Sequence, residues 1–145
     1  MAQGRKDRDV QHNERSALMQ ITSHFNLGEF KCKDGTEVPD DLQGNTIALV
    51  MALEHLRGEV NAPITIISGY RTQKYNRECG GATNSQHLKG KAGDIRVLGF
   101  APSDVATILE ELIASGTIPQ GGIGIYEMQN FVHYDVRGKR ARWKG

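Results

Sequence analysis

Apolar residues at helical spacing predict a long helix in the first half of the chain. From Asp41 onward they follow the period of a helix, so they fall on one face. Gly58 stands where a C-terminal cap is expected, because glycine adopts the left-handed backbone conformation without steric cost. The residues of the apolar face are Leu42, Leu49, Val50, Leu53 and Leu56. We therefore predict a helix that begins near Asp41 and ends at Gly58.

Two further helices are expected later in the chain. Residues 72–79 predict a short helix, and a longer one is capped by the Ser103 hydroxyl and continues through Ala114. Gly116 then marks its end. The inner face of the longer helix consists of Val105, Ile108, Leu109, Leu112 and Ile113.

Four strands are expected between and after these helices. Residues 64–68 are rich in β-branched side chains and follow a proline, which is typical of a buried strand. Residues 91–97 predict a second strand, and residues 121–126 and 130–136 predict two neighbours joined by a short turn. The segment 25–30 carries two phenylalanines that we expect in the core. The fold class that follows is α+β, with helices packed on one side of a small, mainly antiparallel sheet.

Composition favours one globular domain. The chain has 145 residues, of which 38% are hydrophobic and 24% charged. Residues 1–16 are polar and charged, so we predict a flexible basic tail followed by a single domain over residues 17–145. The tail lacks the apolar centre of a secretory signal, and we expect synthesis in the cytoplasm. The longest apolar run, residues 47–53, is too short to cross a membrane.

The charge balance argues against nucleic acid as the main partner. The formal net charge is +1, whereas phosphate recognition usually requires a strongly basic domain. Both ends are locally basic and could touch an anionic polymer such as a bacterial wall, although solvated ends are the simpler interpretation. Cys32 and Cys79 form no CxxC pair, which excludes zinc-finger chemistry and leaves a single disulfide open. Nothing indicates an oligomer, so a monomer is expected.

Three residues indicate a metal centre. His87 lies in a polar, glycine-rich loop, and Asp94 lies on the strand that follows it. The small residues between them let both side chains converge, and a bulky residue at Gly90 or Ala92 would fill the space that an ion needs. His133 lies on a different strand. A catalytic zinc commonly has two ligands that are close in sequence and a third that is distant in sequence, and its fourth position is left to water.

The segments that carry these residues resemble a known family. "SGYRT", "NSQHLKGKAGDI", "GGIGIY" and "NFVHYDVRG" look like the zinc D-Ala-D-Ala carboxypeptidases, the M15 peptidases, which include bacterial wall carboxypeptidases and phage endolysins. The likeness covers about residues 25–137 and extends to the wider hedgehog/DD-peptidase fold group. It implies hydrolysis of peptide bonds in bacterial peptidoglycan by zinc-activated water, as a DD-carboxypeptidase or as an endopeptidase of endolysin type. The zinc ion (Zn²⁺) would be held by His87, Asp94 and His133.

The resemblance also suggests roles for two residues near the metal. Arg71 corresponds to the family's arginine that faces the substrate carbonyl, where a guanidinium can stabilise the developing oxyanion. Alternatively, Arg71 could only form an ion pair at the surface. Ser85 resembles a residue at the cleft edge that binds the substrate, the stem peptide of peptidoglycan, and its alternative is to shape a turn.

One departure from the family pattern concerns the general base. Many members carry Glu or Asp three positions before the last ligand, where this chain has Asn130, and related enzymes carry a histidine at the position of Phe131. Asp135 shares a strand face with His133, so it is a candidate base or an acceptor that orients a ligand imidazole. Glu127, at the turn before the strand, is the other candidate.

Two interpretations other than an enzyme stay open. The chain could be a non-catalytic, zinc-containing module that binds the wall, or a phage virion component. An endolysin made in the cytoplasm would act on the wall after release. The glycine pairs at residues 80–81 and 121–122 match no phosphate-binding motif, so we interpret them as tight turns beside the cleft. Which peptidoglycan bond is cut depends on pocket shape, which sequence does not give.

Overall fold

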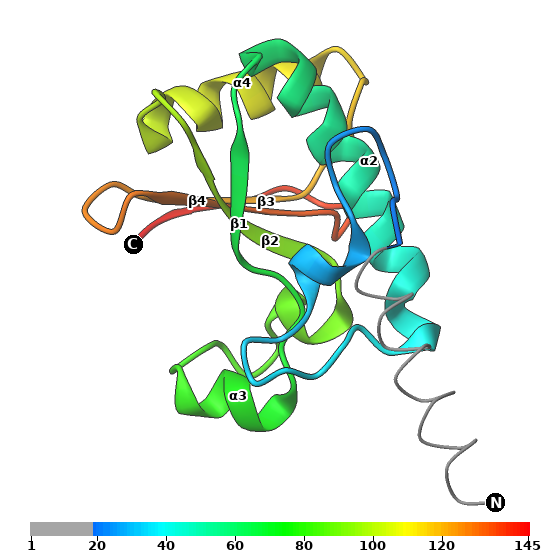
Figure 1. Cartoon of the computed structure of the whole chain (residues 1–145). Coiled ribbons are helices and arrows are strands. Elements are labelled where there is room, and N and C mark those ends of the chain that lie inside the picture. The colour runs from blue at the N-terminus through cyan, green and yellow to red at the C-terminus, as the bar shows by residue number, and fades with distance from the viewer. Residues whose placement is uncertain (1–18) are drawn as a thin grey trace, which may run out of the picture.

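A five-stranded sheet forms the centre of the protein (Figure 1). The computed structural model describes residues 19–145, and the tail predicted over residues 1–16 lies outside them. The strand order is β1-β2-β4-β3-β5, and every pair is antiparallel except β3 with β5. The strands are β1 Ile64–Ser68, β2 Ala92–Val97, β3 Gly122–Tyr126, β4 Phe131–Asp135 and β5 Ala141–Lys144.

Two long helices cover one face of this sheet. These are α2 (Gln43–Val60) and α4 (Pro102–Ala114), which pack on each other and on the central strands. Shorter elements are η1 Leu27–Phe30, η2 Asp40–Leu42, α3 Gln73–Glu78 and η3 Gln86–Lys89. Figure 1 shows α4 and α3 on opposite sides of the strands. The prediction of an α+β fold with a mainly antiparallel sheet is confirmed, and the two long helices lie on one side as expected, whereas the short helix α3 does not.

Alternation along the central strands separates a core face from a polar face. Ile95 on β2 and Tyr134 on β4 are buried in the hydrophobic cluster under the helices. Because neighbouring side chains point to opposite faces, Asp94 and His133 lie on the other side of the sheet. Phe25 and Phe30 join the core at 1% exposure each, as predicted. The helices stabilise one face and leave the other available for polar chemistry.

Two helix boundaries differ from the prediction. Helix α2 runs through Gly58 and ends at Asn61, which takes the left-handed conformation with φ 45°. Helix α4 begins after Ala101 with Pro102 in its first turn, and Ser103 lies inside it instead of capping it. The carboxylate of Glu127 accepts the Ser103 backbone N–H at 3.1 Å, so a residue distant in sequence satisfies this helix end.

Strand β5 corrects the interpretation of the C-terminal end as a solvated basic segment. Arg142 on β5 donates through Nε to Glu110 of α4 at 3.1 Å and through Nη1 to the Gly121 carbonyl. Gly121 lies directly before β3 and forms no turn, and a Cβ at that position would lie 1.7 Å from the Asp135 carbonyl oxygen. Gly80, with φ +73°, does adopt a turn conformation. Among residues 19–145, no helix is both long and apolar enough to cross a membrane.

The Glu110–Arg142 contact should make part of the stability depend on pH. The hydrogen bond from Arg142 lowers the pKa of Glu110 below its ordinary value of 4.5, so the folded state favours the carboxylate. This contribution is present above pH 4.5 and is lost as the pH falls through the lowered pKa. Glu110→Gln should therefore reduce the free energy of unfolding at pH 7 by under about 1 kcal/mol, since the pair is partly exposed. Denaturant midpoints of both proteins should converge in acid, and a difference that is constant with pH would contradict this assignment.

Candidate metal centre

One row of residues crosses the whole sheet and carries the polar site. Ser68 pairs with Asp94, Asp94 with His133, His133 with Gly124, and Gly124 with Trp143. Residues directly opposite each other on neighbouring strands point to the same face. The sheet register therefore brings Asp94 and His133 together on the face that the helices leave open.

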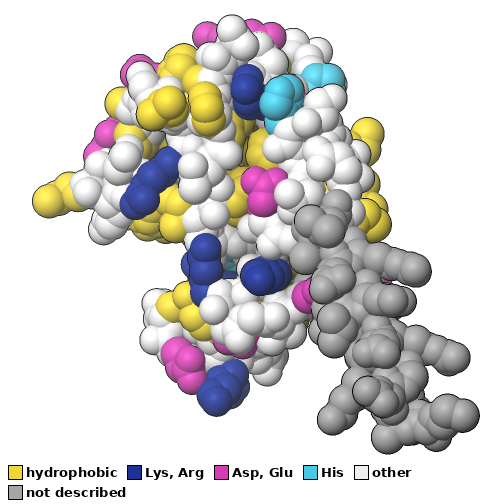
Figure 2. Space-filling view, in the orientation of Figure 1, with side chains coloured by type: hydrophobic (Ala, Val, Ile, Leu, Met, Phe, Trp, Pro, Cys, Tyr) yellow, Lys and Arg dark blue, Asp and Glu magenta, His cyan; other side chains and the backbone are white. Residues whose placement is uncertain are grey.

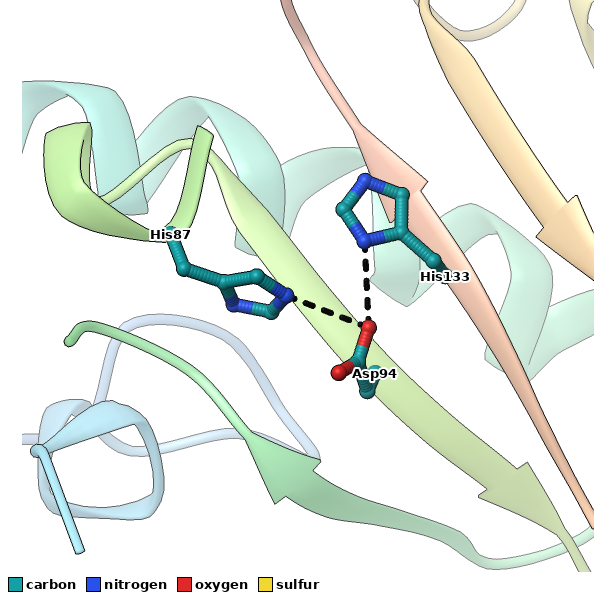
Figure 3. Close-up of side chains that lie close together, drawn as sticks. All are labelled: His87, Asp94 and His133. Atoms are coloured by element: carbon teal, nitrogen blue, oxygen red, sulfur yellow. Dashed lines mark hydrogen bonds and ion pairs between the residues drawn. The ribbon is translucent and has the colours of Figure 1, made fainter. Parts of the chain in front are cut away.

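His87 reaches this row from the segment before β2 (Figure 3). It lies on η3, which begins where the Ser85 hydroxyl accepts the His87 backbone N–H at 3.2 Å. His87 Nε2 lies 3.2 Å from Asp94 Oδ1, and His133 Nδ1 lies 3.1 Å from the same oxygen. One donor atom from each of these three buried residues lies within 4.8 Å of the other two. The predicted metal residues thus converge on one point.

Hydrogen bonds on the outer sides of the two rings fix which nitrogen faces that point. His87 Nδ1 lies 2.7 Å from the Gly69 carbonyl oxygen, which can only accept, so Nδ1 carries the proton and Nε2 is left with its lone pair. His133 Nε2 lies 2.6 Å from Asp135 Oδ2, so in the neutral ring Nε2 carries the proton and the Nδ1 lone pair faces Asp94. Two imidazole lone pairs and a carboxylate oxygen that face one another repel unless a proton or a cation lies between them. This donor set fits a divalent metal ion.

Burial and ion pairing act on these groups in different directions. Burial lowers the pKa of His87 and outweighs its contacts with Asp94, which keeps the imidazole neutral as a ligand must be. Burial acts in the same direction on His133, but hydrogen bonds with Asp135 and Asp94 prevail and raise its pKa. Burial would raise the pKa of Asp94, yet the two histidines hold it well below its usual range. The carboxylate is therefore ionised, as metal binding requires.

Gly90, between His87 and Asp94, does not act as predicted. Gly90 has φ +69°, and a Cβ there would lie 2.8 Å from the Thr46 hydroxyl of α2. A Cβ on Gly93 would face Leu49 and Leu53, on the helix side of the sheet. Gly90 and Gly93 allow close packing on α2, so the expectation that Gly90 keeps space for the ion is wrong.

Arg71 and Ser85 both line the cleft above the three residues. Arg71 donates through Nε to Ser68 Oγ at 3.1 Å, through Nη1 to Asn76 Oδ1 at 3.3 Å and through Nη2 to Asp94 Oδ2 at 3.3 Å. With 15% of its side chain exposed, Arg71 forms no surface ion pair. Gly81 makes room for this arrangement, because a Cβ there would lie 2.0 Å from Asn76 Oδ1. Sequence reasoning assigned no role to Asn76, which lies in the short helix after Arg71.

Comparison with known proteins now defines the family. A family model for Peptidase M15 matches residues 23–135. The chain belongs to the Peptidase M15 family. The M15 match contains His87, Asp94 and His133, together with Arg71 and Ser85.

Two curated relatives are similar to part of this M15 chain. The probable peptidoglycan L,D-endopeptidase MepK of Haemophilus influenzae is 39% identical over 90 residues, which are 59% of this chain and 45% of that protein. The peptidoglycan L,D-endopeptidase MepK of Escherichia coli is 36% identical over 86 residues, which are 56% of this chain and 43% of that protein. The match thus covers less than half of the length of each relative.

The two predicted base candidates occupy different places in this M15 chain. Asp135 is fully buried and accepts hydrogen bonds from the Gly122 N–H at 2.9 Å and from Arg137 Nε at 2.9 Å, besides its contact with His133. Glu127 does not line the cleft, and its carboxylate caps α4. Asn130 forms the hairpin turn with φ 56°, whereas Phe131 faces the cleft. The structure therefore brings Asp135 to His133 and leaves Glu127 away from the cleft.

Asp135→Asn should weaken metal binding by about 10- to 100-fold, the usual effect of removing the outer partner of a metal-bound histidine. Asp135 fixes the His133 ring through Nε2, and an amide can present its NH₂ group there instead of an acceptor. Competition with a chelator of known affinity would measure the change. Asp104→Asn, at an exposed position on α4, provides the matched control and should leave metal affinity unchanged. Equal affinities of the Asp135 variant and the parent protein would contradict the positioning role.

Proposed function

We propose that this chain is a zinc-dependent metallopeptidase that hydrolyses peptide bonds of bacterial peptidoglycan. The observation that carries this proposal is the convergence of His87 Nε2, Asp94 Oδ1 and His133 Nδ1 at a cleft, in a chain of the M15 family. The two MepK relatives, both named as peptidoglycan endopeptidases, support the substrate class. They favour cleavage within a peptide over removal of a terminal residue.

Two imidazole nitrogens and one carboxylate oxygen are a ligand set that catalytic zinc commonly has. Zinc bound there would supply Lewis-acid chemistry, which polarises a peptide carbonyl and makes water a nucleophile near neutral pH. His87, Asp94 and His133 would hold the ion. The remaining steps are assigned to other residues of the chain.

Arg71 is positioned to bind the oxygen of the scissile carbonyl. Its guanidinium lies at Asp94 Oδ2, on the side of that carboxylate away from the histidines, and is held by Ser68 and Asn76. Negative charge develops on the carbonyl oxygen when water attacks, and a fixed cationic donor stabilises it. Ser85 lies at the cleft edge, where its hydroxyl can also meet a substrate backbone group.

Asp135 is proposed as a positioning residue. It is shielded from the cleft and contacts His133 on the far side of the ring. Through this contact it sets the direction of His133 Nδ1 and increases the basicity of the ring. We assign it no proton transfer with the substrate.

Incubation of the purified, zinc-loaded protein with peptidoglycan tests the proposal. Mass spectrometry should show new amino termini within the stem peptides or their cross-links, and a chelator should prevent their formation. Release of free terminal D-alanine alone would identify a carboxypeptidase instead. No cleavage of any peptide bond would refute the proposed enzyme.

A second candidate is a non-catalytic module that binds the wall. One observation favours it: among the described residues that line the cleft, Asp94 is the only carboxylate. The same experiment separates the two functions, because a binding module would sediment with peptidoglycan and leave its peptides intact.

A further inference from the structure

The C-terminal residues beyond the M15 match form one wall of the cleft. Arg137 and Trp143 line it together with His133, although the family match ends at residue 135. Two glycines of β3 make room for them. A Cβ on Gly122 would lie 2.3 Å from Asp135 Oδ2 and 2.8 Å from Arg137 Nη2, and a Cβ on Gly124 would lie 2.3 Å from Trp143 Nε1. The alternate glycines of "GGIGIY" thus make room for Trp143 and for the Asp135–Arg137 pair.

Trp143 fixes this wall next to the metal residues. Its Nε1 donates to the Tyr126 hydroxyl at 2.8 Å, and its ring centroid lies 4.9 Å from that of His133. Tyr126 in turn stacks on Phe131 with centroids 4.3 Å apart. The result is a rigid aromatic surface beside the reacting centre.

Arg137 is held over this surface with part of its guanidinium still available. Nε and Nη2 donate to the two oxygens of Asp135 at 2.9 Å and 2.8 Å, and Cζ lies 5.6 Å from the Trp143 ring centroid. Within residues 19–145 no hydrogen bond engages Nη1, and 22% of the side chain is exposed. In Arg71, by contrast, all three nitrogens have partners. Figure 2 shows basic side chains at the border of the hollow between the sheet and the part that carries α3.

We propose that Arg137 binds a carboxylate of the substrate peptide and so selects substrates that carry an acidic group near the scissile bond. A planar guanidinium with a free amino group suits a carboxylate, and its contacts with Asp135 and Trp143 remove the entropy cost of ordering it. This inference rests on the proposed function, since the ligand is the peptide that the enzyme would cleave. The alternative is that Arg137 only neutralises the buried charge of Asp135.

Substrate pairs distinguish these roles. Each stem peptide is compared with a form in which one carboxylate is converted to a carboxamide. The kcat and KM of both peptides are measured for the parent protein, Arg137→Gln and Arg140→Gln. One carboxamide should raise KM of the parent protein roughly tenfold, the effect of losing a charged hydrogen bond. Arg137→Gln should show the same KM for the carboxylate and the carboxamide form of that peptide. Arg140→Gln, which removes an exposed arginine that pairs with Glu110 away from the cleft, should keep the tenfold preference.

A purely structural role would lower the activity of Arg137→Gln on both peptides equally and leave the preference intact, which would overturn the proposal. A parent protein that is indifferent to every carboxamide would overturn it too. If Arg137→Gln does not fold, Arg137→Lys replaces it. Lysine keeps the charge beside Asp135 but lacks the planar pair of amino groups, so the preference should again disappear.

Failure of the proposed function would give a different result. If the parent protein cleaves no peptide, binding of the same pairs to the zinc-loaded protein is measured through tryptophan fluorescence. Trp143 is the only tryptophan in the chain and lies in the cleft. A roughly tenfold weaker Kd for one carboxamide, absent in Arg137→Gln, would support the subsite without hydrolysis. Equal Kd values would refute it.

Discussion

Replacing His133 with alanine is expected to abolish both zinc binding and peptidoglycan hydrolysis. The variant retains only His87 and Asp94 as ligands, and it also removes the group that Asp135 orients. Zinc affinity and kcat/KM should each fall by more than about a hundredfold, because loss of an outer partner alone typically costs 10- to 100-fold. Zinc content after dialysis and cleavage of stem peptides would measure the two effects.

The matched control is His55→Ala. His55 is exposed on α2, and the same change there should leave zinc content and activity unchanged. Thermal unfolding of both variants verifies that they fold. Full hydrolysis by His133→Ala would contradict the ligand assignment. Loss of hydrolysis with normal zinc content would show that His133 contacts the substrate and does not bind the metal.

Replacing Arg71 with lysine is expected to reduce kcat by about a hundredfold while zinc content stays the same. Removal of one donor from an oxyanion site typically costs 10²- to 10³-fold in kcat. Lysine keeps the positive charge, but it cannot contact Ser68, Asn76 and Asp94 with three separate nitrogens as the guanidinium does. Asp94 Oδ1, which faces the histidines, has no contact with Arg71, so metal binding should persist.

Arg96→Lys is the control for this variant. Arg96 also lies on the sheet, but its guanidinium donates to the backbone carbonyls of Gln129 and Asn130 in the hairpin. It should show normal kcat. If Arg71→Lys raised KM and left kcat unchanged, Arg71 would contribute to substrate binding and not to stabilisation of the developing charge.

The convergence of His87, Asp94 and His133 could be predicted because local patterns determine most of their geometry. Alternation along β2 and β4 places Asp94 and His133 on one face, and antiparallel pairing then sets them opposite each other. His87 is added by a short connection that ends in Gly90. Sequence spacing and family resemblance pointed to the same three side chains.

Strand β5 could not be predicted by the same reasoning. It has four residues, and its alternating pattern is obscured by Arg140, Arg142 and Lys144, which resemble a solvated end. Its position depends on parallel pairing with β3 and on the contact of Arg142 with Glu110, both of which are distant in sequence. Trp143 was missed for this reason, although a lone tryptophan among charged residues is a usable signal.

The wrong helix boundaries have a related cause. The end of α2 depends on Asn61, since an exposed glycine such as Gly58 costs only about 1 kcal/mol inside a helix. The start of α4 depends on Glu127, which binds the backbone of Ser103 from the hairpin. The same contact removed Glu127 from the candidates for a general base at the cleft. Residues that satisfy a distant backbone group resemble free catalytic groups when only the sequence is known.

The central claim is that three side chains bind one zinc ion at the cleft. A crystal structure of the zinc-loaded protein with anomalous diffraction at the zinc edge tests it most directly. We predict one ion bound by His87 Nε2, an Asp94 carboxylate oxygen and His133 Nδ1 at about 2.0–2.2 Å, with a further position open to solvent. Zinc bound at other residues, or a fourth protein ligand that closes the site, would contradict the account.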